Sequence, residues 1–558
     1  MRLKALFMSM AASLALVGCS SEENIAPGTG NGNNGEPQFL TVSVNATSIL
    51  TRDATLGGDY EEGVGKENEV SNVRFYFFDA DGKAAQVKGE SGGTYFDVSP
   101  MSGTENDMPN VEKILTATLV IQTPQKDKIP TSIVAVVNPA ETPGEVESIS
   151  KLNEVIADHS STESFIMSNS VYANGTAKME AVNVAGHLYS TAEAAKANPV
   201  IIHVERVLAK ARLTVGLTAA GDHSDVYKTS TDGSLKYGED EIYVKFLGWN
   251  VTATAKTSRL MKEINPLWPT DLFSQTLLWN TADYYRSFWA VNPAPMTYNY
   301  GSFNTSGDTK AANAITAFDA GSTEAPKTNY TYLQENASDN YEDGTDPANP
   351  SQVIIAAQLV KKDGYTPIEF AEYAGEKTTI DGLIAKYAAA SGLWKDKADG
   401  GKEQISVDDI ELKTATEARV ANQATPGRYK VYAQLTSTAS GYTWYSSSAN
   451  DATSVNANEI LKHLGGAKVW KDGYTYYYFD IRHLNGSSTE ANAKGKNGVV
   501  RNHIYAANIN TLAGLGTPVY DPDEVIYPEK PENDDTYIAA EIRILSWRLV
   551  KQDIDLEW

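Results

Sequence analysis

One stretch decides the fold class: Phe39-Leu40-Thr41-Val42-Ser43-Val44, in which apolar and polar side chains alternate. Alternation with a period of two is typical of a β-strand that buries one face. The same period, with abundant Val, Ile, Thr and aromatic residues, recurs at 73–78, 114–122, 132–137, 200–215, 241–254, 352–360, 429–436, 474–481 and 538–549. The sequence therefore predicts a mainly β protein.

Helical patterns are short and few. They cover 145–157 and 380–394, where apolar residues recur at helical spacing. Turn pairs that tolerate positive φ, such as Asp81-Gly82, Asp472-Gly473 and Asn485-Gly486, lie between or beside the apolar runs. Because 558 residues are too many for one core, we expect two β-sandwich domains. Gly, Asp, Ser and Thr cluster at 218–240, so the expected domains are 53–218 and 219–525.

The N-terminal segment has the three-part layout of a secretion signal that ends at Cys19, the single cysteine of the chain. The run Leu16-Val17-Gly18-Cys19 resembles a bacterial lipobox, in which cleavage before the cysteine is followed by its acylation. We therefore expect residues 1–18 to be a lipoprotein signal peptide and Cys19 to be the lipidation site. An ordinary signal peptide is the alternative. A transmembrane helix over residues 1–18 is disfavoured, because the apolar part is too short to cross about 30 Å of hydrocarbon. The acidic run Ser20-Ser21-Glu22-Glu23 resembles the surface-export tag of Bacteroidota lipoproteins, or is simply an acidic spacer.

Charge excludes one class of partner. The formal net charge is −24 at pH 7, which argues against nucleic acid, because phosphates require basic patches. After Cys19 no apolar run approaches 18 residues, so the mature chain is expected to meet the membrane only through its lipid. Residues 24–37 have the Gly- and Asn-rich composition of a flexible linker.

Catalytic and metal-binding patterns fail in their context, and we expect no catalytic residue, metal or cofactor. Gly89-Glu90-Ser91-Gly92-Gly93 satisfies a serine-nucleophile pattern but lacks the strand before it and the helix after it. Asp79-Ala80-Asp81-Gly82-Lys83 has Lys where a calcium loop needs an oxygen ligand, so a hairpin turn is favoured. The aromatic run 474–479 fits a buried strand better than a sugar-stacking platform. No two histidines are close in sequence; they stand at 159, 187, 203, 223, 463, 483 and 503.

Several motifs, spread over most of the chain, resemble one family. The most specific is Val499-Val500-Arg501-Asn502-His503-Ile504-Tyr505, followed by Leu515-Gly516-Thr517-Pro518 and the closing stretch Ala540-Glu541-Ile542-Arg543-Ile544-Leu545-Ser546-Trp547. Weaker matches lie at 134–138, 204–210, 285–290 and 332–336. In these motifs the chain resembles the fimbrillins of Bacteroidales-type (type V) pili, and among them the major shaft subunit of the short fimbria.

That resemblance implies two transthyretin-like β-sandwich domains and assembly by strand exchange. In the family, a trypsin-like, arginine-specific protease removes the first strand of a lipidated precursor, and a neighbour's strand fills the vacated groove. Here the removable first strand would carry Phe39, Val42 and Val44, and residues 19–52 would form the propeptide. Arg52 is the only basic residue between Lys4 and Lys66, so cleavage is expected between Arg52 and Asp53. Asp53 departs from the small residue typical of the family and is expected to slow cutting.

At the other end of the chain, a tether precedes an apolar tail, and residues 526–558 are expected to form the tether and donor strand. Three prolines with surrounding acidic residues exclude 521–535 from a central strand. Such an apolar tail would aggregate if left free, so it needs a groove, either in a neighbouring subunit or in its own. A shift of parity within the tail suggests a bulge or two successive strands. The expected donor residues are Ile538, Ala540, Ile542, Ile544, Leu545, Trp547 and Leu549.

The expected function is structural rather than enzymatic: a fimbrial shaft subunit at the cell surface, exported to the outer membrane, that supports adhesion and biofilm. The resemblance implies a homopolymer with accessory anchor and tip subunits, a processing protease, and a host or bacterial surface receptor. The alternatives are a surface glycan-binding lipoprotein and a minor or tip fimbrial subunit. A glycan-binding lipoprotein would share the lipobox and the β-sandwiches, but it would not need an arginine-limited first strand or a tethered apolar tail.

Overall fold

The computed structural model describes residues 37–47, 63–89, 92–99, 102–105, 111–123, 129–140, 142–174, 177–229, 235–264, 291–293, 296–301, 303, 316–317, 330–336, 351–415, 429–481, 498–523 and 548–557. The chain forms two compact units. The first unit holds the described residues up to Val207 together with 259–264 and Val291. The second unit holds 208–258 and the described residues from Asn292 onward.

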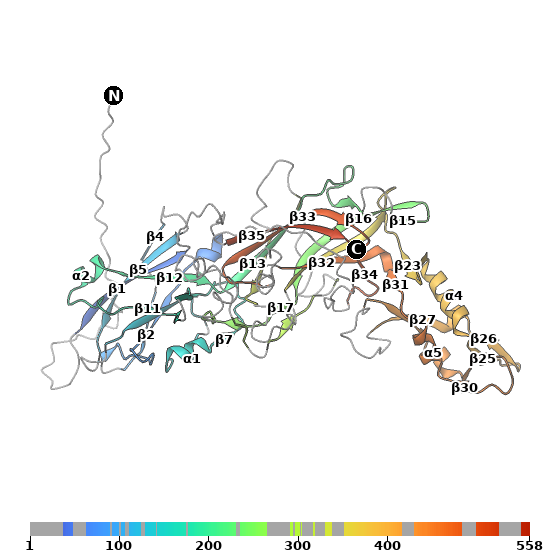
Figure 1. The fold of residues 1–558 in the computed structure, drawn as a ribbon, viewed down its shortest axis with the longest axis horizontal. Coiled ribbons are helices and arrows are strands. Elements are labelled where there is room, and N and C mark those ends of the chain that lie inside the picture. Colours follow the sequence, from blue (N-terminus) through green and yellow to red (C-terminus); the bar gives the residue numbers. More distant parts are fainter. Residues whose placement is uncertain are drawn as a thin grey trace, which may run out of the picture. The chain divides into compact units, whose positions relative to one another are not determined.

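The first unit is built on one nine-stranded sheet, with strand order β3-β2-β6-β8-β12-β1-β5-β4 and β11 paired with β6. Figure 1 shows β1 beside β5 and β12. Its elements are β1 (Gln38–Thr47), β2 (Val73–Phe78), β3 (Tyr95–Val98), β4 (Ser102–Glu105), β5 (Val111–Ile121), β6 (Ser132–Val137), α1 (Ile149–Asn153), β7 (Ile156–Ala157), β8 (Met167–Asn169), β9 (Tyr172–Asn174), β10 (Ala177–Met179), β11 (Val182–Asn183), α2 (Ala192–Ala197) and β12 (Val200–Arg206).

This sheet encloses a single core. Strands from both halves of the strand order send alternate side chains into one buried cluster, so the sheet curves around it. The burial follows the period of two that the sequence carries: Phe75 and Phe77 from β2 meet Val42 and Val44 from β1. Asn138, just after β6, adds a polar tie: its side chain donates to the Glu69 and Phe165 carbonyls and accepts from the Ser71 N–H.

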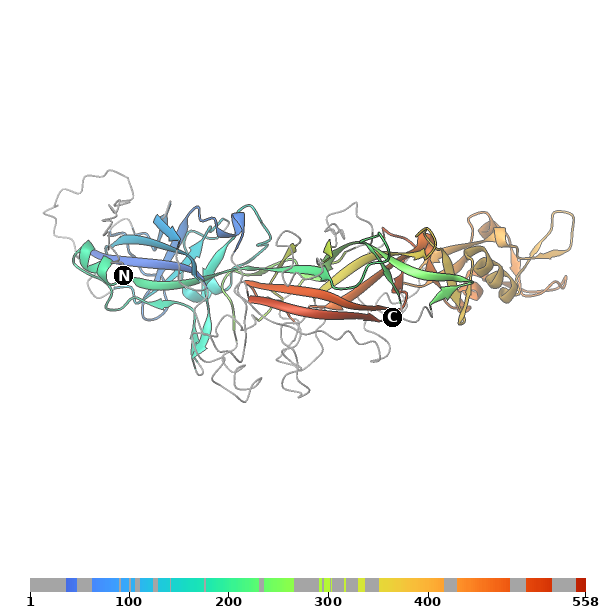
Figure 2. The same ribbon diagram turned by 90° about the horizontal axis from the view of Figure 1, so that it is seen from above.

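The second unit contains a sandwich of two sheets. One sheet has the order β20-β13-β33-β35 with β21 paired with β13, and the other has β14-β16-β22-β32-β34 with β15 paired with β16. Both sheets contribute inward side chains to a common core, for example Leu213 from β13, Trp249 from β16 and Tyr477 from β32. In Figure 2 the orange and red arrows of β33 and β35 run side by side. This is the sandwich architecture that alternating strands favour.

The elements of the second unit include two helices and further short strands. They are β13 (Leu208–Val215), β14 (Val226–Lys228), β15 (Lys236–Tyr237), β16 (Asp240–Thr252), β17 (Thr254–Ala255), β18 (Ser258–Arg259, at the division), β19 (Tyr298–Asn299), β20 (Thr316–Ala317), β21 (Tyr330–Gln334), β22 (Gln352–Lys361), β23 (Phe370–Tyr373), β24 (Glu376–Thr378), α4 (Ile380–Ser391), β25 (Trp394–Asp396), β26 (Lys402–Gln404), β27 (Ile410–Thr414), β28 (Val431–Leu435), β29 (Trp444–Tyr445), β30 (Ser454–Val455), α5 (Ala457–His463), β31 (Lys468–Trp470), β32 (Tyr474–Asp480), β33 (His503–Ala513), β34 (Thr517–Pro518) and β35 (Arg548–Glu557).

The predicted class, mainly β with a few short helices, is confirmed, while several boundaries differ. The strand predicted at 200–215 is divided at Val207, whose N–H donates to Ile166 outside the ladder, and β13 belongs to the second unit. The contacts therefore divide the chain before the boundary expected at 218/219. The strand predicted at 241–254 breaks at Ala253, which has φ of 51°. The helix predicted at 145–157 forms only as α1.

Local signals set the ends of α4 and the turn before β32. Thr379 caps α4 by accepting a hydrogen bond from the Gly382 N–H, and Gly392 ends the helix in the left-handed region, with φ of 64°. The predicted turn at Asp472-Gly473 has positive φ at both residues, 53° and 75°. At Gly473 an added Cβ would lie 2.5 Å from the Leu359 carbonyl oxygen, so only glycine fits there.

Candidate functional site

The first predicted strand, β1, is hydrogen-bonded along both of its edges. It pairs antiparallel with β5, from Gln38 opposite Ile121 to Thr47 opposite Val111. It also pairs parallel with β12, from Val42 opposite Val200 to Ala46 opposite Val204. Removing this strand would leave unpaired donors and acceptors on two neighbours at once. The place of β1 is therefore a slot that fits an extended segment of chain, and we call it the β1 slot.

The side chains of β1 divide between two faces. Leu40, Val42 and Val44 are fully buried in the core of the first unit. On the other face, Thr41 Oγ1 lies 3.0 Å from Thr118 Oγ1 of β5, and Phe39 is half-buried. Of the three residues predicted for this strand, Val42 and Val44 share the core face and Phe39 does not. Leu40 also lies on the core face, as the period of two indicates, although it was not among the residues predicted for the strand.

The start of β1 is held from outside the sheet as well. Phe39 and Tyr189 exchange backbone hydrogen bonds of 2.7 and 2.9 Å. The short helix α2 follows Tyr189 and packs against β1 and β5. Phe39 is therefore paired with Val120 of β5 on one edge and with Tyr189 on the other. The slot is thus defined by β5, β12 and the segment at Tyr189.

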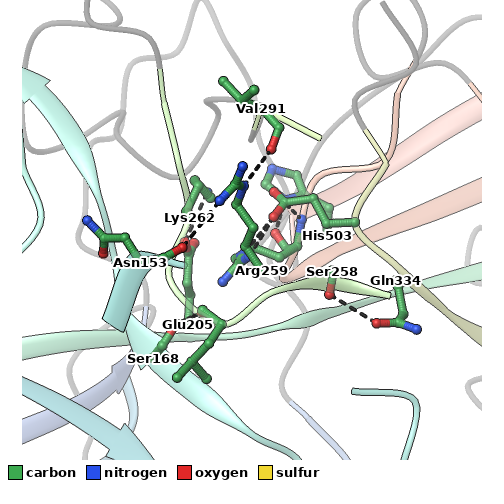
Figure 3. Close-up of polar contacts among 12 residues, drawn as sticks. Asn153, Ser168, Glu205, Ser258, Arg259, Lys262, Val291, Gln334 and His503 are labelled. Carbon is green, nitrogen blue, oxygen red and sulfur yellow. Dashed lines mark hydrogen bonds and ion pairs between the residues drawn. The ribbon is translucent and has the colours of Figure 1, made fainter. Parts of the chain in front are cut away.

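Strand β12, which borders the β1 slot, carries a buried ion pair on the face that points away from the core. Glu205 in β12 points away from the core, and its Oε1 lies 2.9 Å from Lys262 Nζ; neither side chain is exposed. The register partner of Glu205 in β8 is Ser168, whose hydroxyl donates to the Leu260 carbonyl at 2.7 Å. Figure 3 shows Lys262, Glu205 and Ser168 together. Residues 259–264 therefore cover the outside of β12 and β8.

The same covering segment makes a second ionic contact. Lys178 Nζ lies 2.9 Å from both carboxylate oxygens of Glu263 and 2.9 Å from Glu180. Burial opposes the charged form of Lys178, but the hydrogen bonds to Glu180 and Glu263 outweigh it and raise the pKa of Lys178. Lys178 is therefore charged at neutral pH and holds the covering segment with Lys262. No charged pair at these positions was predicted from the sequence.

The described part of the C-terminal tail is a strand of its own subunit's sheet. β35 pairs parallel with β33, from His503 opposite Arg548 to Ala513 opposite Glu557. Leu549, one of the predicted donor residues, is opposite Ile504 in this register. Within the described residues β35 has one strand neighbour, whereas β1 has two. The single chain thus adopts the alternative of a groove in its own subunit, and the donor role remains a prediction.

The other predicted processing and donor residues lie outside the described residues. These are Cys19, Arg52, Asp53, Ile538, Ala540, Ile542, Ile544, Leu545 and Trp547.

Two of the sequence motifs meet at the start of β33. Arg501 is fully buried, and its guanidinium lies 2.7 Å from Glu335 Oε2 through both Nε and Nη2. The adjacent Val499 and Asn336 exchange backbone hydrogen bonds of 2.7 and 2.9 Å. Asn502, with φ of 57°, donates its N–H to the Leu208 carbonyl at 2.8 Å. These motifs, far apart in sequence, thus fix the position of the strand that receives β35.

The patterns rejected from the sequence have structural roles in the described residues. Gly89 and Gly92 both have positive φ, and the Gly92 N–H donates to the Gly89 carbonyl, so they form a turn. Asp79 Oδ1 accepts from the N–H groups of Asp81 and Lys83, also within a turn. The aromatic run of β32 is buried between two strands. Among the described residues no group of three metal-ligating side chains occurs, and no helix is long and apolar enough to cross a membrane.

Comparison with known proteins gives one family. Residues 468–553 match the model of the fimbrillin C-terminal region, described as a major fimbrial subunit protein of type IV. The match runs from β31 through β33 and ends within β35. No curated protein sequence matches the chain.

Solved structures give distant likenesses. A fimbrilin of Porphyromonas gingivalis shares 12% identity over 93% of this chain and 97% of that one, with a TM-score of 0.34. A fimbrial assembly protein of Parabacteroides distasonis shares 11% identity over 60% and 85% of the two chains, with a TM-score of 0.29. The tip fimbrial protein of P. gingivalis with a C-terminal truncation shares 11% identity over 58% and 81%, with a TM-score of 0.25. These scores are too low to carry an argument, so the likeness to fimbrillins rests on the family model, which matches residues 468–553 of this chain.

Proposed function

We propose that this chain is the shaft subunit of a surface fimbria and that it polymerises by strand exchange through the β1 slot. The observation that carries the proposal is the position of β1: it is the most N-terminal strand described, yet it is central in its sheet and fills the core. A terminal strand in such a place can be removed by one cut of the chain. Its removal leaves two unpaired ladders and an open core, which a neighbour's strand can complete.

The energetics favour transfer of a C-terminal strand into the slot. Among the described strands of its own subunit β35 pairs only with β33, whereas the β1 slot offers both β5 and β12. A strand that moves there gains a second ladder of hydrogen bonds. Burying three side chains in place of Leu40, Val42 and Val44 contributes about 5–9 kcal/mol before ordering costs. Because each subunit gives one strand and receives another, the contact repeats head to tail and builds a filament.

The remaining steps follow from this mechanism. The precursor is carried to the outer membrane by the lipid on Cys19, and a trypsin-like, arginine-specific protease cuts after Arg52. The trimmed subunits form a homopolymer, joined to accessory anchor and tip subunits, at the cell surface. The match of residues 468–553 to the fimbrillin C-terminal model supports the fimbrial location. The function is then mechanical and adhesive rather than catalytic.

Blocking the cut at Arg52 tests the proposal directly. Arg52→Ala is expected to leave β1 in its slot, so the protein stays monomeric after protease treatment, as measured by size-exclusion chromatography. Fibres of the unchanged protein should begin at Asp53 by N-terminal sequencing. Lys66→Ala, at the next basic residue, is the matched control and should assemble normally. Fibres that begin at Cys19, or that form from Arg52→Ala, would remove strand excision from the mechanism.

Lipidation is tested separately. Cys19 is the only cysteine, so Cys19→Ala is expected to abolish incorporation of a labelled fatty acid into the precursor. Surface display, measured by protease accessibility on intact cells, should be lost with the label. Ser20→Ala provides the control for an effect of the neighbouring sequence. Undiminished labelling of the Cys19→Ala protein would reject the lipobox assignment.

A further inference from the structure

A large insertion separates two strands that are neighbours in one sheet. β22 and β32 pair antiparallel, with Gln358 opposite Tyr474, in the sandwich of the second unit. At this register a short hairpin would connect them. Instead the chain between them forms β23 to β31, including α4 and α5, before it returns. Figure 1 shows α4, α5, β25 and β26 beyond β23 and β31. We call residues 371–469 the guest module and the sandwich of the second unit the host.

The guest module has a core of its own. Its buried cluster includes Leu383 and Tyr387 from α4, Trp444 from β29 and Leu461 from α5. The host core is a different cluster, and the two clusters share no residue. Within the described residues the guest core comprises Ala371, Leu383, Tyr387, Ala388, Leu393, Ile405, Ile410, Leu412, Val431, Ala433, Leu435, Ala439, Trp444, Ala457, Leu461, Ala467 and Val469.

Strands β23 and β31 form the border between the two cores, with one face in the host core and the other in the guest core. In β23 and β31, Phe370 is opposite Trp470, and their rings stack with centroids 4.7 Å apart within the host core. The next pair, Ala371 opposite Val469, belongs to the guest core. Because adjacent residues of a strand point to opposite faces, the β23–β31 pair is a wall that completes both cores. Entry to and exit from the guest module are therefore adjacent.

The family match and the guest module have a common boundary. The fimbrillin C-terminal match begins at residue 468, in the strand that leads back from the guest module into the host. The elements used in the proposed strand exchange are β1, β5, β12, β33 and β35. Among the residues of these strands whose side chains the structure describes, none contributes to the guest core.

We propose that the guest module is an independently unfolding domain that the subunit displays and that strand exchange does not require. The part of the proposal that concerns strand exchange rests on the function proposed above. Away from the wall, Lys377 Nζ donates to the Lys236 carbonyl at 3.1 Å, and Tyr520 packs against the guest core and donates its hydroxyl to the Leu412 carbonyl at 3.4 Å. Because these contacts are peripheral to both buried clusters, the guest core can unfold while the host core stays closed. The guest module is then the part of the subunit that can vary or bind a partner while the fibre is preserved.

Hydrogen exchange of the full chain tests independence. Leu461→Ala removes a fully buried side chain of the guest core, and Ile355→Ala does the same in the host core. We expect Leu461→Ala to speed exchange of guest amides in α4 and β28 by about tenfold or more, with β16, β22 and β32 unchanged. Ile355→Ala is expected to give the reverse pattern in β16, β22 and β32, with α4 unchanged. If Leu461→Ala accelerates exchange in guest and host equally, the two unfold together and the proposal is overturned.

A deletion tests the independence of assembly. Residues 374–466 are replaced by Asn-Gly, which joins Tyr373 to Ala467 in a two-residue hairpin and keeps Phe370 and Trp470 in the wall. After trimming at Arg52, the deleted chain is expected to form fibres to the same extent as the full chain, as measured by electron microscopy and sedimentation. Fibres from the full chain with none from a folded deletion variant would overturn the proposal. If the deletion variant does not fold, the Leu461→Ala chain is trimmed and tested for fibres at a temperature at which hydrogen exchange shows the guest module unfolded. Fibres at that temperature support the proposal, and their absence while the unchanged chain still forms fibres overturns it.

Failure of the proposed function can be distinguished from failure of this proposal. If the full chain itself does not polymerise after trimming, strand exchange fails for this protein, while the hydrogen-exchange pattern still decides whether the guest module is independent.

Discussion

A chain trimmed after Arg52 and lacking β35 is expected to remain a folded monomer. The truncation removes residues 536–558, which hold the predicted donor residues and β35, so no donor strand is left to enter a neighbour's β1 slot. Within the described residues β35 is an edge strand with one neighbour, so its loss leaves the rest of that sheet paired. Elongation should fall from complete to undetectable by size-exclusion chromatography and electron microscopy. Far-UV circular dichroism should keep a mainly β spectrum.

A single substitution sharpens this expectation. In the register of the ladder Ile554 is opposite Ile509, a fully buried residue of β33. Ile554→Asp would place a carboxylate at that position in either groove and should block elongation. Asp553→Asn, opposite the half-exposed Asn508, is the matched control and should assemble normally. Fibres of ordinary length from the truncated chain or from Ile554→Asp would exclude β35 as the donor.

Strands β1, β2 and β6 of the first unit could be predicted because their signal is local. Alternation at β1, β2 and β6 follows directly from one face packing on a core, and the structure has these strands where the sequence predicts them. The division at Val207 could not be predicted, because it depends on a hydrogen bond to Ile166, which is distant in sequence. The position of β35 could not be predicted either, since an apolar tail fits any open sheet edge.

The buried charge of Glu205 could not be predicted from the sequence. In a pattern of period two, Glu205 occupies a polar position and would be expected to face solvent, yet a covering segment from residues 259–264 buries it. The guest module was concealed for a different reason: its short strands and helices have the same composition as the host, and the expected domain 219–525 contains both. Only the contacts separate the two cores.

The largest stability effect is expected at the buried pair behind the slot. Lys262→Met leaves the Glu205 carboxylate buried without its ammonium partner, and Glu205→Gln leaves the ammonium without its carboxylate. Each single change is expected to cost about 3–5 kcal/mol in the stability of the first unit, because the remaining charge stays buried after the opposite charge at 2.9 Å is lost. Changing both residues to Met replaces two charges with apolar side chains of similar volume, and should restore most of that stability.

Hydrogen exchange of the β12 and β1 amides measures the stability of the first unit separately from unfolding of the second unit. Lys151→Met provides the control, since Lys151 and Glu154 form an exposed pair in α1 and its loss should leave exchange in β12 unchanged. Because β12 borders the β1 slot, the single variants should also loosen β1 in the untrimmed chain. A labelled peptide of residues 37–47 should then bind to these variants, whereas it should not bind to the unchanged precursor. Equal exchange rates in the single and double variants would show that the ion pair does not hold β12 in place.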